Sequence, residues 1–327
     1  MRSTITAFLV SAAVLFLLAA PPPAEAQQAG KVARVGVLLF SAPEADPNAA
    51  AFRQGLSDLG YVEGANLTTL YRFAEGKPER LPALASELVA LKPDVILALG
   101  GDVAPFARTA TNVIPIVMAA SQDPVQAGLV ASLSKPGGNI TGVTFVSSEL
   151  AAKRLQILKQ AAPGISRVAV LWNPDHIDPE YRETQAAGKV LGIHVQSLEV
   201  RSAGDFDPAL QAAAAERAEA IVVVSSRLTT INRQRVLEFA ARQRIAVVAG
   251  WGPWVESGAL MSYGPDLNVM VRRTASYVDQ ILKGANPARM PVEQPTKLDL
   301  FINVKTATAL GLTISPSLLL QATRVVE

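Results

Sequence analysis

Polar residues that can bind a small molecule follow a buried apolar run near the middle of this chain. The run IPIVMAA, residues 114–120, ends directly in Ser121, Gln122, Asp123 and Pro124. Strand propensity does not explain this ending, since Asp and Pro are both depleted in strands. The Ser and Gln side chains supply hydrogen-bond donors and acceptors, and a carboxylate pairs with an ammonium group. The stretch therefore predicts a binding site at the end of a strand.

Residues of the same chemical kind follow the other predicted strands. The candidate ligand-binding residues are Ser41, Gly101, Asp102, Ser121, Asp123, Asn173, Ser225, Trp251 and Tyr263. In open α/β sheets, ligands bind outside the carboxyl ends of the strands, where loops and helix N-termini present free N–H groups. Two alternatives stay open for single residues, because Ser, Asp and Asn also cap helices and the two aromatic residues can also fill a core. Their shared position at strand ends in both halves favours binding.

The elements that position these residues are short apolar strands alternating with helices. The predicted strands are residues 34–40, 94–100, 114–120, 167–173, 194–200, 220–226, 245–251 and 259–264. Nearly continuous apolar runs are typical of parallel strands that are covered on both faces. We also expect a helix to begin at Pro124 and to end before the PGGN sequence at residues 136–139. The fold class is α/β, with two Rossmann-like, doubly wound lobes.

The two lobes are expected to be discontinuous in sequence. The chain passes from one to the other near residues 139–148, and Gly264-Pro265 indicates a second crossing, after which the helix 267–284 returns to the first lobe. Lobe 1 is then residues 31–145 plus 267–300, and lobe 2 is residues 146–266 plus 301–327, with the tail the least defined part.

The N-terminus carries the pattern of an export signal. Residues 1–26 contain an early Arg2, an apolar run over residues 5–20, and small residues before a cleavage point at Gln27. A membrane anchor is the alternative, but the run is shorter than the ~20 residues that span a bilayer, and the sequence PPP follows it. We expect cleavage near Ala26 and a periplasmic mature protein.

Composition excludes several classes. The chain has 327 residues, of which 50% are apolar, enough for two packed lobes. It has no cysteine, so no disulfide holds the fold and no lipid can be attached through a cysteine at the cleavage site. The formal net charge is +2, without a run of Lys or Arg, and this argues against nucleic acid as a partner.

Catalytic chemistry finds little support. His176 and His194 are the only histidines, and nucleophile-elbow, zinc-protease, dinucleotide and P-loop motifs are absent. Metal-ligand spacing is also absent, so no cofactor or metal is expected. Asp102 with Asp123 could form an acid/base pair, but no other residue completes such a site.

Long stretches of the chain resemble the ABC-transporter substrate-binding proteins related to tryptophan/tyrosine uptake systems. The matching blocks include residues 34–40, 52–67, 80–100, 114–144, 153–174, 257–266 and 302–319. The pattern DPV…GLV.SL..PGGN.TG, residues 123–142, is the most specific of them. The resemblance implies a type I periplasmic binding-protein fold, with a small ligand held at a three-segment hinge and an ABC permease in the inner membrane as partner.

In this interpretation a small carboxylate or amino-acid-like ligand, or an aromatic one, is captured by hinge closure of a monomer, and no bond is made or broken. A ligand carboxylate would meet Ser41 or Ser121, an ammonium group would meet Asp123 or Asp102, and aromatic residues would form an apolar wall. Two other functions stay open, which are a periplasmic sensor subunit for a membrane signalling protein and an exported enzyme.

Overall fold

The computed structural model describes residues 32–327, apart from 43–45, 101–102, 146–147 and 177–178. Its contacts separate residues 1–32 from a compact unit, Ala33–Glu327, which is described by itself below. The predicted signal peptide, residues 1–26, lies outside the described residues, as do the candidate site residues Gly101 and Asp102.

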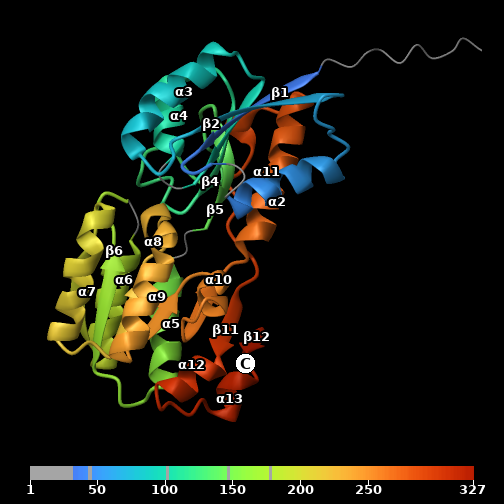
Figure 1. Ribbon diagram of the computed structural model, residues 1–327. Coiled ribbons are helices and arrows are strands. Elements are labelled where there is room, and N and C mark those ends of the chain that lie inside the picture. The colour runs from blue at the N-terminus through green and yellow to red at the C-terminus, as the bar shows by residue number, and fades with distance from the viewer. Residues whose placement is uncertain (1–31, 43–45, 101–102, 146–147, 177–178) are drawn as a thin grey trace, which may run out of the picture. The chain divides into compact units, whose positions relative to one another are not determined.

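The first lobe is built on a five-stranded parallel sheet with the strand order β2-β1-β3-β4-β5 (Figure 1). Its strands are β1 (Ala33–Leu39), β2 (Leu67–Phe73), β3 (Val95–Leu99), β4 (Ile116–Ala120) and β5 (Ile140–Thr144). The helices of this lobe are α2 (Pro47–Asp58), η1 (Pro78–Arg80), α3 (Leu81–Ala90), α4 (Ala104–Ala110), α11 (Leu267–Leu282) and η3 (Pro287–Arg289).

Both faces of this sheet are buried, as β1 shows. Val35, Val37 and Leu39 belong to the core cluster that includes residues of α2 and α11. Leu38 and Phe40 belong to the cluster on the other face, with residues of α3 and α4. Side chains alternate between the two faces of a strand, so a strand with helices on both faces must be apolar throughout. This explains why the chain carries continuous apolar runs.

The second lobe contains a seven-stranded sheet with the order β12-β11-β10-β9-β8-β6-β7. Its strands are β6 (Arg167–Trp172), β7 (His194–Glu199), β8 (Ala220–Val223), β9 (Ala246–Ala249), β10 (Met261–Gly264), β11 (Asp299–Asn303) and β12 (Arg324–Val326). Its helices are α5 (Ser148–Ala161), α6 (Glu180–Leu191), η2 (Ala203–Asp205), α7 (Phe206–Ala215), α8 (Arg227–Ile231), α9 (Arg233–Gln243), α10 (Gly252–Glu256), α12 (Val304–Ala309) and α13 (Pro316–Leu319).

The order of the first five strands is the same in both sheets. In the second sheet β7-β6-β8-β9-β10 repeats the arrangement β2-β1-β3-β4-β5 of the first, and β11 adds to it antiparallel to β10. The structure confirms the predicted fold class, an α/β protein with two doubly wound lobes.

The chain crosses three times between the sheets, after β5, after β10 and before β11. After the second crossing, α11 packs on α2, where a Cβ on Gly55 would lie only 2.8 Å from the Cβ of Ala275. The predicted lobe limits at residues 145 and 266 fall within the first two crossings, and the limit at residue 300 falls inside β11.

The prediction of a helix that begins at Pro124 is wrong, since the chain forms only a single turn there. Gly128 has a φ of 64° and ends the turn in the left-handed region, after which the N–H of Leu129 donates to the carbonyl of Pro124 at 2.8 Å. This is the bonding by which a left-handed glycine closes a helix C-terminus. The glycine therefore stops the helix after one turn.

Candidate functional site

A cavity of about 580 Å³ lies between the two lobes, where the carboxyl ends of strands from both sheets meet. In the first lobe, Ser41 follows β1, Gly100 follows β3 and Ser121 follows β4, and all three line the cavity. Trp251, which follows β9, lines it from the second lobe. In the strand order 2-1-3-4-5, ligands bind at the switch point between the first and third strands. The cavity therefore lies where this fold places a ligand.

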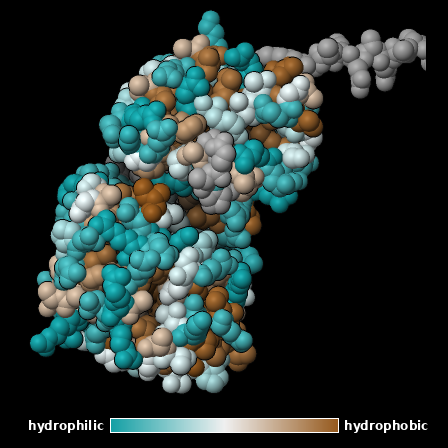
Figure 2. Space-filling view, in the orientation of Figure 1, coloured by the Kyte–Doolittle hydropathy of each residue, from teal (hydrophilic) through white to brown (hydrophobic). Residues whose placement is uncertain are grey.

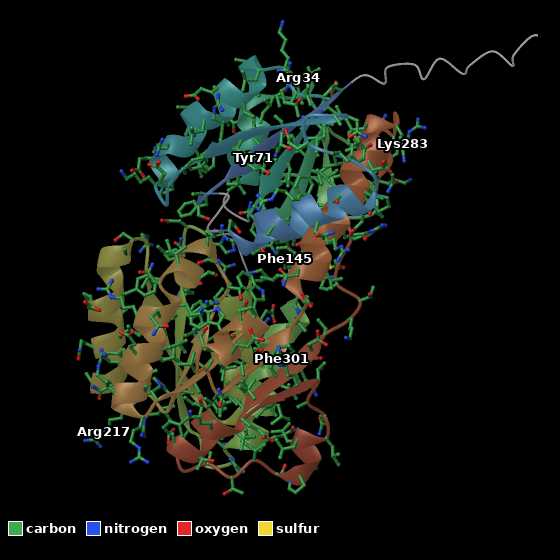
Figure 3. All side chains as sticks on the ribbon, turned by 45° about the vertical axis from the view of Figure 1, so that its right-hand side comes forward. Arg34, Tyr71, Phe145, Arg217, Lys283 and Phe301 are labelled. Atoms are coloured by element: carbon green, nitrogen blue, oxygen red, sulfur yellow. The ribbon has the colours of Figure 1, made fainter. Side chains whose placement is uncertain are left out.

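Aromatic side chains line the cavity, among them Phe145, Trp251 and Phe301, which are together called the aromatic wall below. Figure 3 shows Phe145 at the junction of the lobes and Phe301 below it, in the lobe that contains the C-terminus. Gly252 lets the chain pass close to the ring of Phe301, because a Cβ there would lie 2.6 Å from Cε2. On the face of the protein in Figure 2, brown apolar side chains are visible where the lobes meet. The wall can stack on a planar apolar group.

A charged network joins the two lobes beside the cavity. Arg227, from the N-terminus of α8, forms an ion pair with Asp46 and donates to the Oγ of Ser41 at 2.6 Å. Asp46 is also the N-cap of α2, accepting from the N–H of Asn48 at 3.0 Å. Burial lowers the pKa of Arg227 to about 10. The network thus ties a lobe 2 cation to a lobe 1 carboxylate that water does not reach.

A second contact between the lobes involves Ser121, one of the predicted site residues. Its Oγ lies 3.4 Å from the Nε2 of His176, which follows β6 in the second lobe, and both residues are buried. A hydroxyl and an imidazole can form a hydrogen bond in either direction, depending on the tautomer. Ser121 therefore both lines the cavity and contacts the opposite lobe.

A buried ion pair joins helices α5 and α6 in the second lobe. Arg154 of α5 pairs with Glu180 of α6, and its Nε donates to the carbonyl of Tyr263 at 2.7 Å. A Cβ on Gly250 would lie 2.9 Å from the Arg154 guanidinium and 2.7 Å from the Oγ of Ser225. These contacts hold the ends of β9 and β10 against α5.

The remaining predicted site residues that the structure describes, Asp123, Asn173, Ser225 and Tyr263, are not among the residues that line this cavity. Asn173 accepts from the N–H of Asp175 at 2.9 Å, and Asp123 accepts from the N–H groups of the turn that follows it. Tyr263 packs into the core cluster on the α5 face of the second sheet, and Ser225 lies against Gly250. Their ligand contacts stay predictions.

Several cavity residues were missing from the sequence-based set. Arg227 directly follows the strand-end serines, so its position carried a usable signal. Asp299 and Phe301 lie on β11, for which no strand was predicted, and Phe145 lies at a crossover that no periodicity marks. Asp46, which pairs with Arg227 beside the cavity, has the pattern of a helix cap, and its local sequence does not indicate that a cation from the other lobe will pair with it.

The described part of the chain contains no candidate metal-binding group and no candidate membrane-spanning helix. No group of three or more His, Asp or Glu side chains there is arranged to hold a metal ion. None of the described helices combines the length and apolar character needed to cross a bilayer.

The two sheets, the three crossings and the cavity between lobes define a solute-binding fold of the two-lobe type. The chain belongs to the ABC transporter substrate binding protein family, whose model matches residues 34–326. This is a family of solute-binding proteins and not a family of enzymes, and the resemblance found in the sequence is confirmed.

Individual relatives agree with this assignment. A tyrosine-binding protein of Clostridioides difficile is 27% identical over 277 residues, covering 84% of this chain and 79% of the relative. The structure of an ABC domain in complex with L-Trp from Streptococcus pneumonia has a TM-score of 0.84 at 27% identity, covering 90% of this chain and 99% of that one. A ligand-free, open substrate-binding protein with adhesive properties from Clostridium difficile has a TM-score of 0.64 at 26% identity, covering 90% and 99%.

Proposed function

We propose that this protein is the exported solute-binding component of an ABC uptake transporter, and that it closes its lobes around an aromatic amino acid. The observation that carries the proposal is the cavity, which is lined by both lobes and has the aromatic wall of Phe145, Trp251 and Phe301. Its volume of about 580 Å³ lies within the range of small-molecule sites, roughly 300–1,000 Å³.

The ligand class is supported by the chemistry of the lining and by the relatives. The wall offers flat apolar surfaces, and hydroxyl and charged side chains such as Ser41, Ser121 and Arg227 lie around it. One relative is named for tyrosine and a structural match holds L-Trp. Both of those ligands combine a ring with a charged amino-acid group.

Closure around the ligand is supported by the contacts between the lobes. The Arg227–Asp46 and Ser121–His176 contacts form only when the lobes lie together. At nearly equal identity and coverage, the TM-score is 0.84 with the L-Trp complex and 0.64 with the open, ligand-free protein. A closed lobe pair is what a membrane permease would recognise, and the N-terminal export signal would deliver the protein to it.

The test uses the mature chain from Gln27. Calorimetric titration with L-tyrosine, L-tryptophan and L-phenylalanine should give micromolar or tighter binding of at least one, with L-leucine bound more weakly. Mass spectrometry of solute released on denaturation should find the same compound. If none of the three aromatic amino acids binds, the proposed ligand class is wrong.

A variant pair locates the site. Trp251→Ala should weaken binding at least tenfold, since stacking on an indole contributes about 0.5–1.5 kcal/mol beyond its buried area and the apolar contact of the ring is lost as well. Trp251→Phe is the matched control and should retain most of the affinity, because it keeps a flat apolar surface. Equal affinity of both variants and the wild type would place the ligand elsewhere.

A further inference from the structure

We infer that Asp299 binds the ammonium group of the ligand, which makes it the residue that selects an amino acid over a simple aromatic acid. The inference rests on the proposed function. Asp299 is the first residue of β11, where the chain re-enters the second lobe after its third crossing, and it lines the cavity. Asp299 was not among the residues expected from the sequence to bind ligand.

The carboxylate of Asp299 is buried without a matching donor. Its side chain is 11% exposed, and among the described residues no hydrogen-bond donor reaches its Oδ1. The Nζ of Lys297 lies 3.3 Å away without hydrogen-bond geometry, and the Lys297 side chain is 80% exposed, so water screens this pair. A buried acceptor without a donor is unfavourable and rare in folded proteins. A ligand ammonium group would satisfy it.

The carboxylate lies next to the aromatic wall. Asp299 and Phe301 are two residues apart on one strand, so their side chains point to the same face, and both line the cavity. Opposite Asp299 in the antiparallel pair is Gly264, where a Cβ would lie 2.0 Å from the carbonyl oxygen of Gly250, so no side chain fits at this position. A ligand whose ring lies on the wall can therefore bring an ammonium group to Asp299.

The other described acidic residues of the cavity are already engaged. Asp266 caps α11, accepting from the N–H groups of Asn268 at 2.8 Å and Val269 at 3.3 Å. Glu256 pairs with Arg324 at 2.6 Å. Asp299 is thus the described carboxylate in the cavity that keeps an acceptor without a hydrogen-bond donor.

The experiment compares two ligands that differ in the ammonium group alone, L-tyrosine and 3-(4-hydroxyphenyl)propionate. Wild type should bind L-tyrosine at least thirtyfold more tightly. Asp299→Asn should weaken L-tyrosine binding about thirtyfold, because the charge-assisted bond is lost, and should leave the binding of the propionate within about threefold. Asp207→Asn is the matched control, since Asp207 pairs with Arg235 on the surface and does not line the cavity, and it should leave both affinities unchanged.

A thermal melt separates this role from a structural one. Without ligand, Asp299→Asn should melt at or above the wild-type temperature, because it removes a buried charge that no described donor satisfies. If Asp299→Asn does not fold, tyramine binding to the wild type decides the question, since tyramine keeps the ammonium group and lacks the carboxylate. Tyramine should then bind more tightly than the propionate.

The outcomes distinguish the two proposals. If the wild type binds L-tyrosine no better than the propionate, or if Asp299→Asn weakens both ligands equally, the role of Asp299 is wrong while aromatic binding stands. A wild type that binds no aromatic amino acid would overturn the proposed ligand class and this inference with it.

Discussion

The ion pair between Arg227 and Asp46 should act as a latch that is made when the lobes close. The perturbation is Asp46→Asn, which removes the charge and keeps the oxygen that accepts from the N–H of Asn48 at the start of α2. The second variant is Arg227→Met, which keeps an unbranched side chain and removes the cation. Each variant leaves one charge of the pair buried without its partner.

The magnitude follows from the burial of the pair. The Asp46 side chain is 0% exposed and that of Arg227 is 12% exposed. Breaking a fully buried pair costs about 3–5 kcal/mol. The residual exposure of Arg227 and the remaining hydrogen bond from Ser41 to Asp46, at 3.0 Å, reduce this cost. We expect ~2 kcal/mol, and since only the closed state bears it, the Kd should rise about thirtyfold.

The assay is calorimetric titration of each variant with the ligand identified for the wild type. The double variant Asp46→Asn/Arg227→Met should recover affinity to within about fivefold of wild type, because no buried charge is then left unpaired. Asp207→Asn is the control, since it breaks the exposed Arg235–Asp207 pair within the second lobe and should not change affinity. Single variants with wild-type affinity, or a double variant whose losses simply add, would refute the latch.

Three further predictions concern the fold. Burial and the hydrogen bond to Asp279 raise the pKa of Tyr61 to about 12 from the ordinary 10.0, so its stabilising contribution is complete below pH 10 and is lost as the pH rises through 12. In urea titrations between pH 10 and pH 12, the unfolding free energy of Tyr61→Phe should therefore fall less steeply with pH than that of the wild type. The same dependence on pH in both proteins would contradict this prediction. Gly142→Ala should prevent stable folding of the first lobe, because the residue has a φ of 134° and the added Cβ would overlap the backbone of β4. Gly138→Ala is the control: a Cβ there has no neighbour within 4 Å, and the variant should melt at the wild-type temperature. Asp123→Ala should lower the unfolding free energy by ~1 kcal/mol, since it caps the turn that follows β4, and should leave ligand affinity unchanged; a loss of affinity would instead support its predicted place in the site.

Local pattern was enough to predict the class of fold and some of the residues that line the cavity. Continuous apolar runs over residues 34–40, 94–100 and 114–120 match β1, β3 and β4 within two residues at each end. Burial on both faces leaves this pattern in the sequence itself, whatever the neighbouring strands are. Because parallel strands end at one edge of a sheet, the same pattern also identified Ser41, Ser121 and Trp251, which line the cavity.

Local pattern failed where a short segment depends on distant partners. The strands β11 and β12 are five and three residues long and pair at the edge of the second sheet. The DPV block predicted a helix, yet Gly128 closes it after one turn. A periodicity argument needs several turns or alternations, and these segments are too short to supply them.

The sequence alone determined that the chain is a two-lobe α/β protein with polar side chains at its strand ends, because each of those features depends on residues that are close together in the sequence. Tertiary structure alone decided that Arg227 meets Asp46 across 181 positions of the chain, and that Asp299 and Phe301 face the cavity together. The direction of a side chain and the partner it meets depend on how sheets and crossings pack, and that packing is a property of the whole fold and not of any local segment.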